Sequence, residues 1–237
     1  MDDTSALLHH HLWAIIPALD AAAKLGTSLA ALKLPAGQTI VVDGGSSDAT
    51  LAIARDAGAT VVSAPRGRGT QLAAGAEAAL AQGAMWLLFV HADTRLEEGW
   101  TRAVRAFIEA TSARGHAAYF RLAFDDPDRR AARVARLANW RARHLGLPYG
   151  DQGLLVPAAL YRAVGGFRPL PLMEDVDLVR RIGRARLVGL DAVATTSADR
   201  YRRDGWWLRP ARNLACLALW FAGMSPDRLV GIYRGRR

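Results

Sequence analysis

The chain has 237 residues, of which 51% are hydrophobic and 22% are charged, and its formal net charge is +9 at neutral pH. This composition can bury a sizeable core, which excludes a disordered chain, and the length fits one large domain or two small ones. The arginines gather in residues 129–143 and 200–237, so an anionic partner is expected, either phosphate, nucleic acid or an acidic membrane surface. Zinc-finger spacing, ribonucleoprotein motifs and helix-turn-helix patterns are absent, and we therefore expect no nucleic-acid partner.

Cysteine content and apolar runs indicate the compartment. Cys216 is the single cysteine, which excludes an intramolecular disulfide and favours a reducing environment. The first residues, MDDTSALLHHH, carry acids and no long apolar run, unlike a secretory signal. No stretch reaches the roughly 18 apolar residues of a membrane-spanning helix. These features predict a cytoplasmic protein.

The first half alternates short β-branched apolar runs with alanine-rich helical stretches. We expect strands at 12–16, where Pro17 stops the first, and at 39–42, 60–63 and 85–90. We expect helices at 21–34, from an N-cap at Asp48 to Ala57, and from an N-cap at Thr70 to about Gln82. Continuous apolar strands separated by helices are typical of a parallel sheet covered on both faces. Right-handed crossovers then predict a Rossmann-like, doubly wound α/β fold with a mostly parallel sheet.

After Asp93 the alternation changes. We expect a helix at 97–111, a strand at 117–124, an arginine-rich helix at 128–144, a strand at 154–156 and a helix at 174–182. Because no proline- or serine-rich linker and no repeat divides the chain, we predict one domain over 1–237. It comprises a nucleotide-binding half at about 12–95, an acceptor half at about 96–200 and a C-terminal helical segment at about 201–237.

Polar side chains follow three of the expected strands. The segments after them read PALD from Pro17, DGGS from Asp43 and HADT from His91. In open α/β sheets ligands bind beyond the carboxyl ends of the strands, so these segments predict a site for a polar, metal-bound ligand. The Gly-x-Gly-x-x-Gly fingerprint and the P-loop are both absent, which argues against standard dinucleotide and P-loop binding. Capping of the next helix is an alternative explanation for each acid.

Four segments occur in a characteristic order: IIPALD, VVDGGSSDAT, FVHADTR and LMEDVDLVRRI. In order and spacing they resemble the family 2 glycosyltransferases of GT-A fold. More narrowly, the sequence resembles the radical-SAM/selenodomain-associated transferase 2 subfamily, through RGRGTQLAAGA, LPYGDQG, VGGF and the tail from SADRYRRDGWWLRPARNL to SPDRL. The resemblance covers about residues 14–234. It implies metal-dependent, inverting transfer of a sugar from a nucleotide diphosphate-sugar to an acceptor hydroxyl.

The resemblance assigns nucleotide contacts to the first two strand ends. It implies that Pro17, Ala18 and Leu19 line the nucleotide pocket, and that Asp43 hydrogen-bonds the base or ribose with Gly45 beside it. Gly44 stands where many family members have a second acid, which is a departure from the family pattern.

The resemblance assigns the metal to the segment that follows the expected strand at 85–90. His91-Ala92-Asp93 occupies the place of the family's Asp-x-Asp motif, with Ala92 against the donor. Asp93 is the expected metal ligand, and His91, which replaces the first acid, is an alternative contact. Oxygen ligands suit Mg²⁺ or Mn²⁺, and a nearby imidazole favours Mn²⁺ slightly.

An acidic pair, Glu174 and Asp175, matches the pair at the start of the family's acceptor-side helix. Sugar transfer needs a base that takes the acceptor hydroxyl proton and a cation that neutralises the departing diphosphate. We expect Asp175 to be that base and Glu174 to orient the acceptor. The alternative is that both acids stabilise a helix N-terminus through its dipole.

Further contacts are expected outside these motifs. Arg66 and Arg68, in a glycine-rich turn, can reach the donor phosphates, as can a closing segment that carries Arg200. Asp151 and Gln152 are expected to contact the acceptor or the donor sugar. An ordinary solvated loop is the alternative for each segment.

The C-terminal segment holds Trp206 and Trp207 and the apolar run 214–224 among arginines. This pattern is consistent with an amphipathic helix on the inner face of an anionic membrane, where it would bring the enzyme to a lipid-linked acceptor. The alternative is a helix that packs on the core or on a second subunit of a homo-oligomer.

The expected partners are a UDP- or GDP-type sugar nucleotide and a hydroxyl acceptor. Two other functions stay open. A nucleotidyltransferase shares the topology and the metal, but the glycine-rich loop with lysine that it uses near the first strand is absent. A non-catalytic nucleotide-sugar-binding protein would explain why His91 and Gly44 replace acids.

Overall fold

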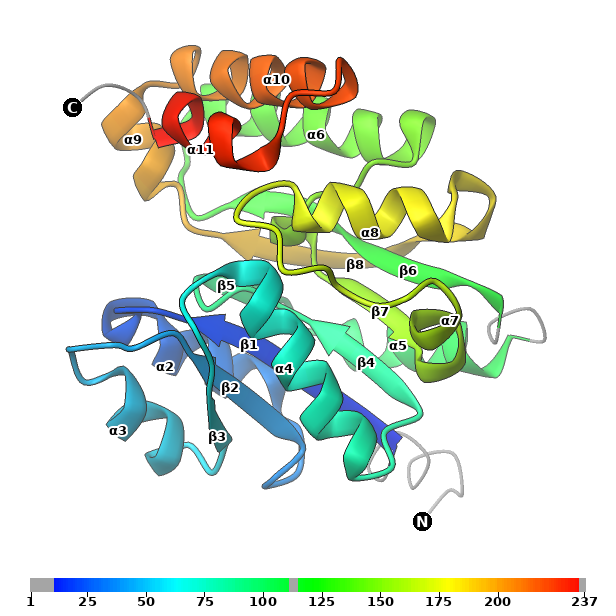
Figure 1. Ribbon diagram of the computed structural model, residues 1–237. Coiled ribbons are helices and arrows are strands. Elements are labelled where there is room, and N and C mark those ends of the chain that lie inside the picture. Colours follow the sequence, from blue (N-terminus) through cyan, green and yellow to red (C-terminus); the bar gives the residue numbers. More distant parts are fainter. Residues whose placement is uncertain (1–10, 111–114, 235–237) are drawn as a thin grey trace.

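The computed structural model describes residues 11–110 and 115–234, which form an α/β fold around one eight-stranded sheet (Figure 1). The strand order is β3-β2-β1-β4-β7-β6-β8-β5. The strands are β1 (Leu12–Ala18), β2 (Thr39–Asp43), β3 (Thr60–Ser63), β4 (Trp86–Phe89), β5 (Thr94–Leu96), β6 (Ala117–Phe124), β7 (Leu154–Pro157) and β8 (Leu187–Thr196).

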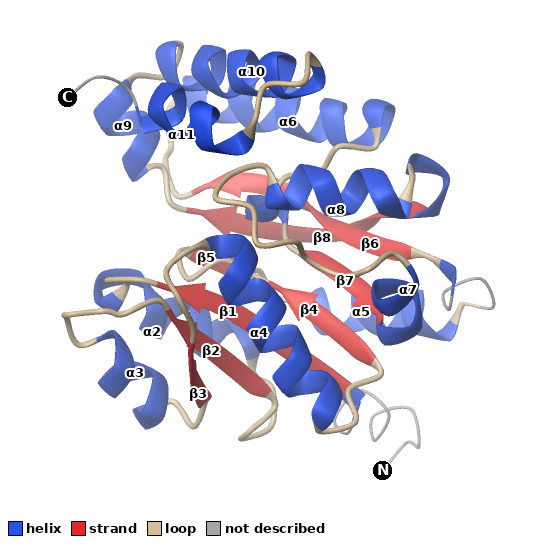
Figure 2. Cartoon of the chain, viewed as in Figure 1, coloured by secondary structure: helices blue, strands red, loops and turns tan. Residues whose placement is uncertain are grey.

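Helices flank this sheet on both faces (Figure 2). The helices of the first half are α2 (Ala22–Leu32), α3 (Thr50–Asp56), α4 (Arg68–Ala81) and α5 (Trp100–Glu109). Those that follow are α6 (Arg129–Leu145), η2 (Gly150–Gln152), α7 (Ala158–Ala163), α8 (Glu174–Ile182), η3 (Arg184–Arg186), α9 (Asp199–Asp204), α10 (Leu208–Phe221) and α11 (Pro226–Arg234).

The predicted α/β class is confirmed, with a parallel first half and a mixed second half. β1 pairs in parallel with both β2 and β4, and β2 pairs in parallel with β3. β7 is antiparallel to β4 and β6, β8 is parallel to β6, and β5 is antiparallel to β8. The predicted nucleotide and acceptor halves therefore share a single sheet.

The core consists of two layers because the central strands β1, β2 and β4 are buried on both faces. Ile15 belongs to the layer that includes side chains of α4, α7, α8, α10 and α11, whereas its neighbours Ala14 and Ile16 belong to the layer that includes those of α2, α3 and α5. This alternation is the two-residue period of a strand. Gly75 lets α4 lie close to the sheet, since a Cβ there would be 2.5 Å from Ile15 Cγ2.

The structure corrects three predicted boundaries. β1 continues through Pro17, because β4 pairs with β1 only as far as Ile15 and the proline therefore removes no hydrogen bond on that side. α3 begins at Thr50, and the Asp48 carboxylate accepts hydrogen bonds from the Thr50 and Ala22 amides, which ties α3 to the start of α2. α4 begins at Arg68 after an N-cap at Gly67, so Thr70 lies within the first turn.

The C-terminal helices α9, α10 and α11 form one group above β8 in the view of Figure 1, and α10 packs against both α9 and α11. Cys216, Leu217 and Leu229 are buried in the core, so one face of α10 packs on the protein as one of the alternatives expected. Among the residues that the structure describes, no helix combines the length and apolar character needed to cross a membrane.

Candidate active site

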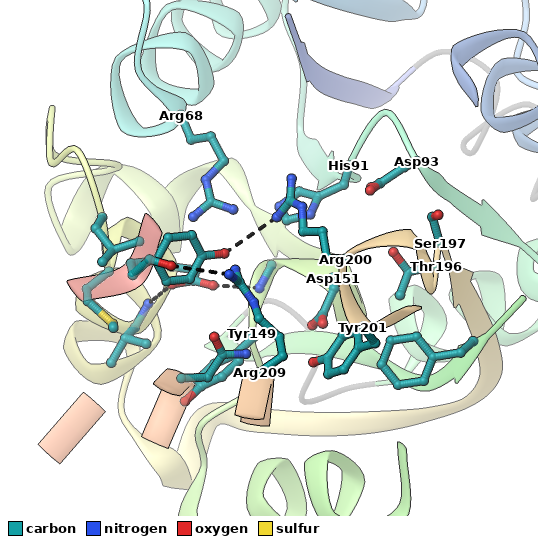
Figure 3. Close-up of a pocket in the computed structure, with 18 residues that line it drawn as sticks. Arg68, His91, Asp93, Tyr149, Asp151, Thr196, Ser197, Arg200, Tyr201 and Arg209 are labelled. Carbon is teal, nitrogen blue, oxygen red and sulfur yellow. Dashed lines mark hydrogen bonds between the residues drawn. The ribbon is translucent and has the colours of Figure 1, made fainter. Parts of the chain in front are cut away.

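Two hollows meet beyond the carboxyl ends of β1 and β4. The first, of about 1390 Å³, contains residues from both strand ends and is called the rim cleft; it is lined by Pro17, Ala18, Leu19, Asp20, Ala21, Lys24, Arg66, Gly67, Arg68, Gln71, His91, Ala92, Asp93, Pro171, Arg200 and Val230. The second, of about 740 Å³, is called the inner pocket. Its polar and aromatic lining comprises Arg68, His91, Asp93, Phe124, Tyr149, Asp151, Asp175, Thr196, Ser197, Arg200, Tyr201, Arg209, Asn213 and Tyr233 (Figure 3). The side chains common to both are Arg68, His91, Asp93 and Arg200.

The rim cleft lies where the strand order reverses, since β1 has β2 on one side and β4 on the other. This is the switch point at which doubly wound sheets bind ligands. It brings the predicted residues of 17–19 together with Ala92 and Asp93. Lys24, Arg66 and Arg68 make the lining basic, which suits a phosphate group.

Asp43 and Gly45 lie outside the linings of both hollows. The Asp43 side chain is buried, and its carboxylate accepts hydrogen bonds from the amides of Gly45 (2.9 Å) and Ser46 (3.1 Å). Its oxygens therefore hold the glycine turn, while the predicted contact with a base or ribose stays a prediction.

Gln71 is a polar residue of this region that sequence reasoning missed. It is buried in α4, and its Nε2 donates to the carbonyls of Ala18 and Val42, each at 2.8 Å. These bonds fasten the ends of β1 and β2 to one helix. The available signal was a long amide on an alanine-rich helix that otherwise buries only small and apolar side chains.

His91 and Asp93 stand at the junction of the two hollows. Burial and the charges of Arg68 and Arg200 lower the pKa of His91 to about 3, so its imidazole is neutral. The described residues contain no group of three or more His, Cys, Asp or Glu side chains that would bind a metal alone. The Asp93 carboxylate and the neutral His91 ring nevertheless fit Mn²⁺ or Mg²⁺ if a ligand supplies phosphate oxygens.

Asp175 reaches the inner pocket from the first turn of α8. Its carboxylate accepts hydrogen bonds from the Gly150 amide and from the Val176 amide, each at 2.7 Å. Met173, immediately before α8, has a left-handed backbone with φ of 66°, which is uncommon for a bulky side chain. The two amides hold the Asp175 carboxylate at the wall of the inner pocket.

Glu174 points elsewhere. Its side chain is 1% exposed and forms an ion pair with Arg68, with 2.9 Å between Oε1 and Nε, and it is absent from the lining of the inner pocket. Burial raises the pKa of Glu174, and the Arg68 charge opposes this rise. The geometry gives Glu174 the task of holding Arg68, and contact with an acceptor stays a prediction.

Asp151 and Gln152 also diverge. Asp151 lines the inner pocket, and its buried Oδ1 has no hydrogen-bond partner among the described residues. Gln152 is completely buried, and its amide donates to the Phe120 carbonyl (3.2 Å) and to Asn139 Oδ1 (3.3 Å). Gln152 therefore anchors the turn to β6 and α6 without lining either hollow, and the predicted contact with a sugar stays a prediction.

Replacing Asp151 should change stability in a pH-dependent way. Burial raises the pKa of Asp151 to about 6, so ionising it in the folded chain costs stability as pH rises from about 4 to 6. Asp151→Asn removes this cost, and we expect it to stabilise the protein at pH 8 by on the order of 2 kcal/mol. Thermal melts of both proteins at pH 4 and pH 8 test this. An advantage of equal size at both pH values would contradict it.

The C-terminal helices close the inner pocket, and the sequence predicted only Arg200 among them. Tyr201 lies on α9, Arg209 and Asn213 on α10, and Tyr233 on α11. Arg200 donates to the Tyr233 hydroxyl at 3.5 Å. Figure 3 shows Arg68, His91 and Asp93 along one side of the pocket and Tyr149, Arg209 and Tyr201 along the opposite side.

A Rossmann-like half with a basic cleft at its switch point, opening onto an acid-lined pocket, is the architecture of a GT-A glycosyltransferase. The chain belongs to glycosyl transferase family 2, since the model of that family matches residues 13–161. Comparison with curated proteins gives no match.

Solved structures with the same fold include TarS of S. aureus, a glucosyl-3-phosphoglycerate synthase and a mycobacterial protein. TarS 1–349 of S. aureus has a TM-score of 0.58 and 16% identity, covering 94% of this chain and 69% of that one. Glucosyl-3-phosphoglycerate synthase from Mycobacterium tuberculosis, in complex with Mn²⁺, UDP and glucosyl-3-phosphoglycerate, has a TM-score of 0.54 and 20% identity over 82% and 72% of the chains. The mycobacterial protein has a TM-score of 0.55 and 24% identity over 82% and 67%. At these identities the likeness establishes the fold.

Proposed function

We propose that this protein transfers a hexose-type sugar from a UDP- or GDP-type nucleotide sugar to an acceptor hydroxyl, with inversion at the anomeric carbon. The observation that carries the proposal is the shared wall of the rim cleft and the inner pocket, formed by Arg68, His91, Asp93 and Arg200. A diphosphate in the basic cleft would place its sugar beside that wall, within the pocket that Asp175 lines. We assign the chain to the radical-SAM/selenodomain-associated transferase 2 subfamily on the segments that resemble it.

The donor side of the proposal follows from the rim cleft. The backbone of 17–19 would line the nucleoside, and Arg68 and Arg200 would bind the diphosphate. Asp93, with His91 beside it, would hold a divalent cation, which neutralises the charge on the departing diphosphate. The mycobacterial synthase has been solved with UDP and Mn²⁺ and also with UDP and Mg²⁺, which supports this choice of cation.

The acceptor side rests on Asp175. Two backbone amides hold its carboxylate in place, and each oxygen keeps a lone pair for a further hydrogen bond. The acceptor hydroxyl would give its proton to Asp175 as its oxygen attacks the anomeric carbon from the face opposite the diphosphate. The carbon–oxygen bond to the diphosphate breaks in the same step, which inverts the anomeric centre.

A thermal-shift screen of uridine, guanosine, adenosine and cytidine diphosphates and their sugars, with and without Mn²⁺ or Mg²⁺, tests the donor assignment. A bound nucleotide at a hundredfold excess over its Kd stabilises the fold by about 2.7 kcal/mol. We expect a metal-dependent shift with the uridine or guanosine series. Absence of any shift in folded protein would contradict the proposal.

Product analysis separates the two remaining alternatives. A transferase releases a nucleoside diphosphate, whereas a nucleotidyltransferase acting on a nucleoside triphosphate releases pyrophosphate. A non-catalytic protein would bind the nucleotide sugar and release neither.

We also propose that the outer face of α10 contacts an anionic membrane. Trp207, Leu214 and Phe221 are about half exposed or more, and Ala211 and Ala218 lie exposed between them at helical spacing. α6 adds a second exposed face with apolar, aromatic and basic side chains, namely Arg133, Arg136, Leu137, Trp140 and Arg143. An apolar stripe beside arginines suits the interface of an anionic bilayer.

Vesicle sedimentation tests this contact. Wild type should sediment with phosphatidylglycerol-containing vesicles and stay free of phosphatidylcholine vesicles, and Trp207→Glu with Leu214→Glu should abolish sedimentation. Met85→Glu, at an exposed apolar position before β4, is the matched control. A dimer in ultracentrifugation that the double variant disperses, without vesicle binding by wild type, would assign this face to a second copy instead.

A further inference from the structure

The inner pocket carries more unpaired acid than unpaired base. The guanidinium of Arg209 is buried and pairs with the Asp204 carboxylate (3.3 Å) and with the Tyr233 carbonyl (3.2 Å). Arg68 is paired with Glu174 as described. By contrast, Asp151 and Asp175 form no ion pair within residues 11–110 and 115–234. Arg200, at the wall shared with the rim cleft, is the lining arginine that forms no ion pair among the described residues. The side of the pocket away from that wall therefore disfavours an anion.

Buried polar atoms in this pocket lack partners. Asp151 Oδ1, Asn213 Oδ1 and the Tyr149 hydroxyl are buried, and none has a hydrogen-bond partner within the described residues. Leaving such atoms unsatisfied costs free energy, so a ligand that satisfies them gains affinity. When Asp151 is ionised, its Oδ1 and the Oδ1 of Asn213 can only accept hydrogen bonds. A ligand that satisfies both atoms must therefore donate hydrogen bonds to them.

Aromatic rings complete the wall. Tyr201 lies between Phe124, with ring centroids 4.8 Å apart, and Trp206, stacked at 5.3 Å. Tyr149 lies beneath the Arg141 guanidinium at 3.3 Å. These contacts hold both rings rigidly in the lining of the inner pocket. The C–H face of a sugar ring matches such a surface, and its hydroxyls match the unpartnered oxygens.

We infer that the acceptor is a neutral, hydroxyl-rich molecule, recognised by Asp151, Asn213 and the Tyr149 and Tyr201 rings. The inference rests on the proposed function and gives it an acceptor class. Asn213 and Tyr201 lie outside the matched segment 13–161, so this recognition belongs to the C-terminal helices of this chain. It differs from the phosphoglyceric acid bound by the mycobacterial synthase.

Saturation-transfer NMR on protein loaded with Mg²⁺ and the diphosphate selected by the thermal screen tests the acceptor class. The probes are methyl glucoside with glucuronic acid, and methyl galactoside with galacturonic acid, so that each pair compares a neutral sugar with a carboxylate analogue. We expect saturation of at least one neutral sugar and at least fivefold less of its acid partner. Octyl glucoside below its micelle concentration separates a glycolipid head group, which it mimics, from a free sugar.

Two variants locate the binding. Asn213→Leu and Asp151→Ala should lose the sugar signal and keep the nucleotide signal, because both positions line only the inner pocket. Asp191→Ala, at a highly exposed side chain on β8, should keep both signals. Equal or stronger signals from the acids, or an unchanged sugar signal in Asn213→Leu, would overturn the inference. If wild type gives a nucleotide signal but no sugar signal, the acceptor inference is overturned and the proposed function is not. If wild type gives no nucleotide signal, the proposed function itself is overturned.

Discussion

Asp175→Asn should lower the rate of sugar transfer by about 10²–10⁴-fold and leave nucleotide affinity nearly unchanged. The amide side chain has almost the same shape, and its oxygen can still accept the Gly150 amide hydrogen bond that positions residue 175. It cannot take a proton from the acceptor. Release of nucleoside diphosphate from the donor, measured with and without acceptor, gives the rate, and calorimetric titration gives the nucleotide Kd.

Asp191→Asn is the matched control for this substitution. Its side chain is 96% exposed, so the same loss of charge occurs far from both hollows. We expect wild-type turnover from this control. Unchanged turnover in Asp175→Asn would remove Asp175 from the role of base, and a parallel loss of nucleotide binding would indicate a structural effect.

Asp93→Ala should weaken donor binding in the presence of Mn²⁺ or Mg²⁺ by at least about tenfold and abolish the difference that the metal makes. Asp93 is the carboxylate at the shared wall that would join the cation to the diphosphate. Its removal leaves the basic residues of the cleft, so binding without metal should persist. Titrations of nucleoside diphosphate with metal and with chelator measure both quantities.

Asp56→Ala, at an exposed position at the end of α3, controls for the loss of one acid. It should keep the wild-type response to metal. A metal response of wild-type size in Asp93→Ala would show that the cation is held by other groups.

Periodicity and strand-end chemistry were sufficient for the first half of the fold. β1, β2 and β4 are buried on both faces, and all the strands of this half pair with near neighbours in sequence, so apolar runs and intervening helices specify the parallel arrangement. That arrangement brings residues 17–19 and Asp93 to the same edge, as predicted. Family membership was also readable, because several short motifs in one order identify a family when no single motif does.

The last two strands at one side of the sheet, β8 and β5, were not predicted. β8 pairs with β6 across a long separation in the chain and with a register shift between Tyr119 and Arg121. Several of its side chains are exposed, which interrupts the apolar pattern of LVGLDAVATT. Such a strand is stabilised by its partner and not by a local signal.

The directions of adjacent polar side chains could not be read from the sequence. Asp175 was chosen as the base and Glu174 as the residue that orients the acceptor, and the structure pairs Glu174 with Arg68 while Asp175 lines the inner pocket. Asp151 and Gln152 diverge in the same way.

The sequence by itself determined the α/β class, the family and the meeting of residues 17–19 with Ala92 and Asp93 at one edge of the sheet. These features depend on local periodicity and on short motifs. The tertiary structure decided which residue of each adjacent pair, Glu174 with Asp175 and Asp151 with Gln152, lines the inner pocket. It also decided which helices close that pocket. Tyr201, Asn213 and Tyr233 come together there only because α9, α10 and α11 pack together as one group. Side-chain direction and long-range packing depend on the whole backbone, and no local pattern encodes them.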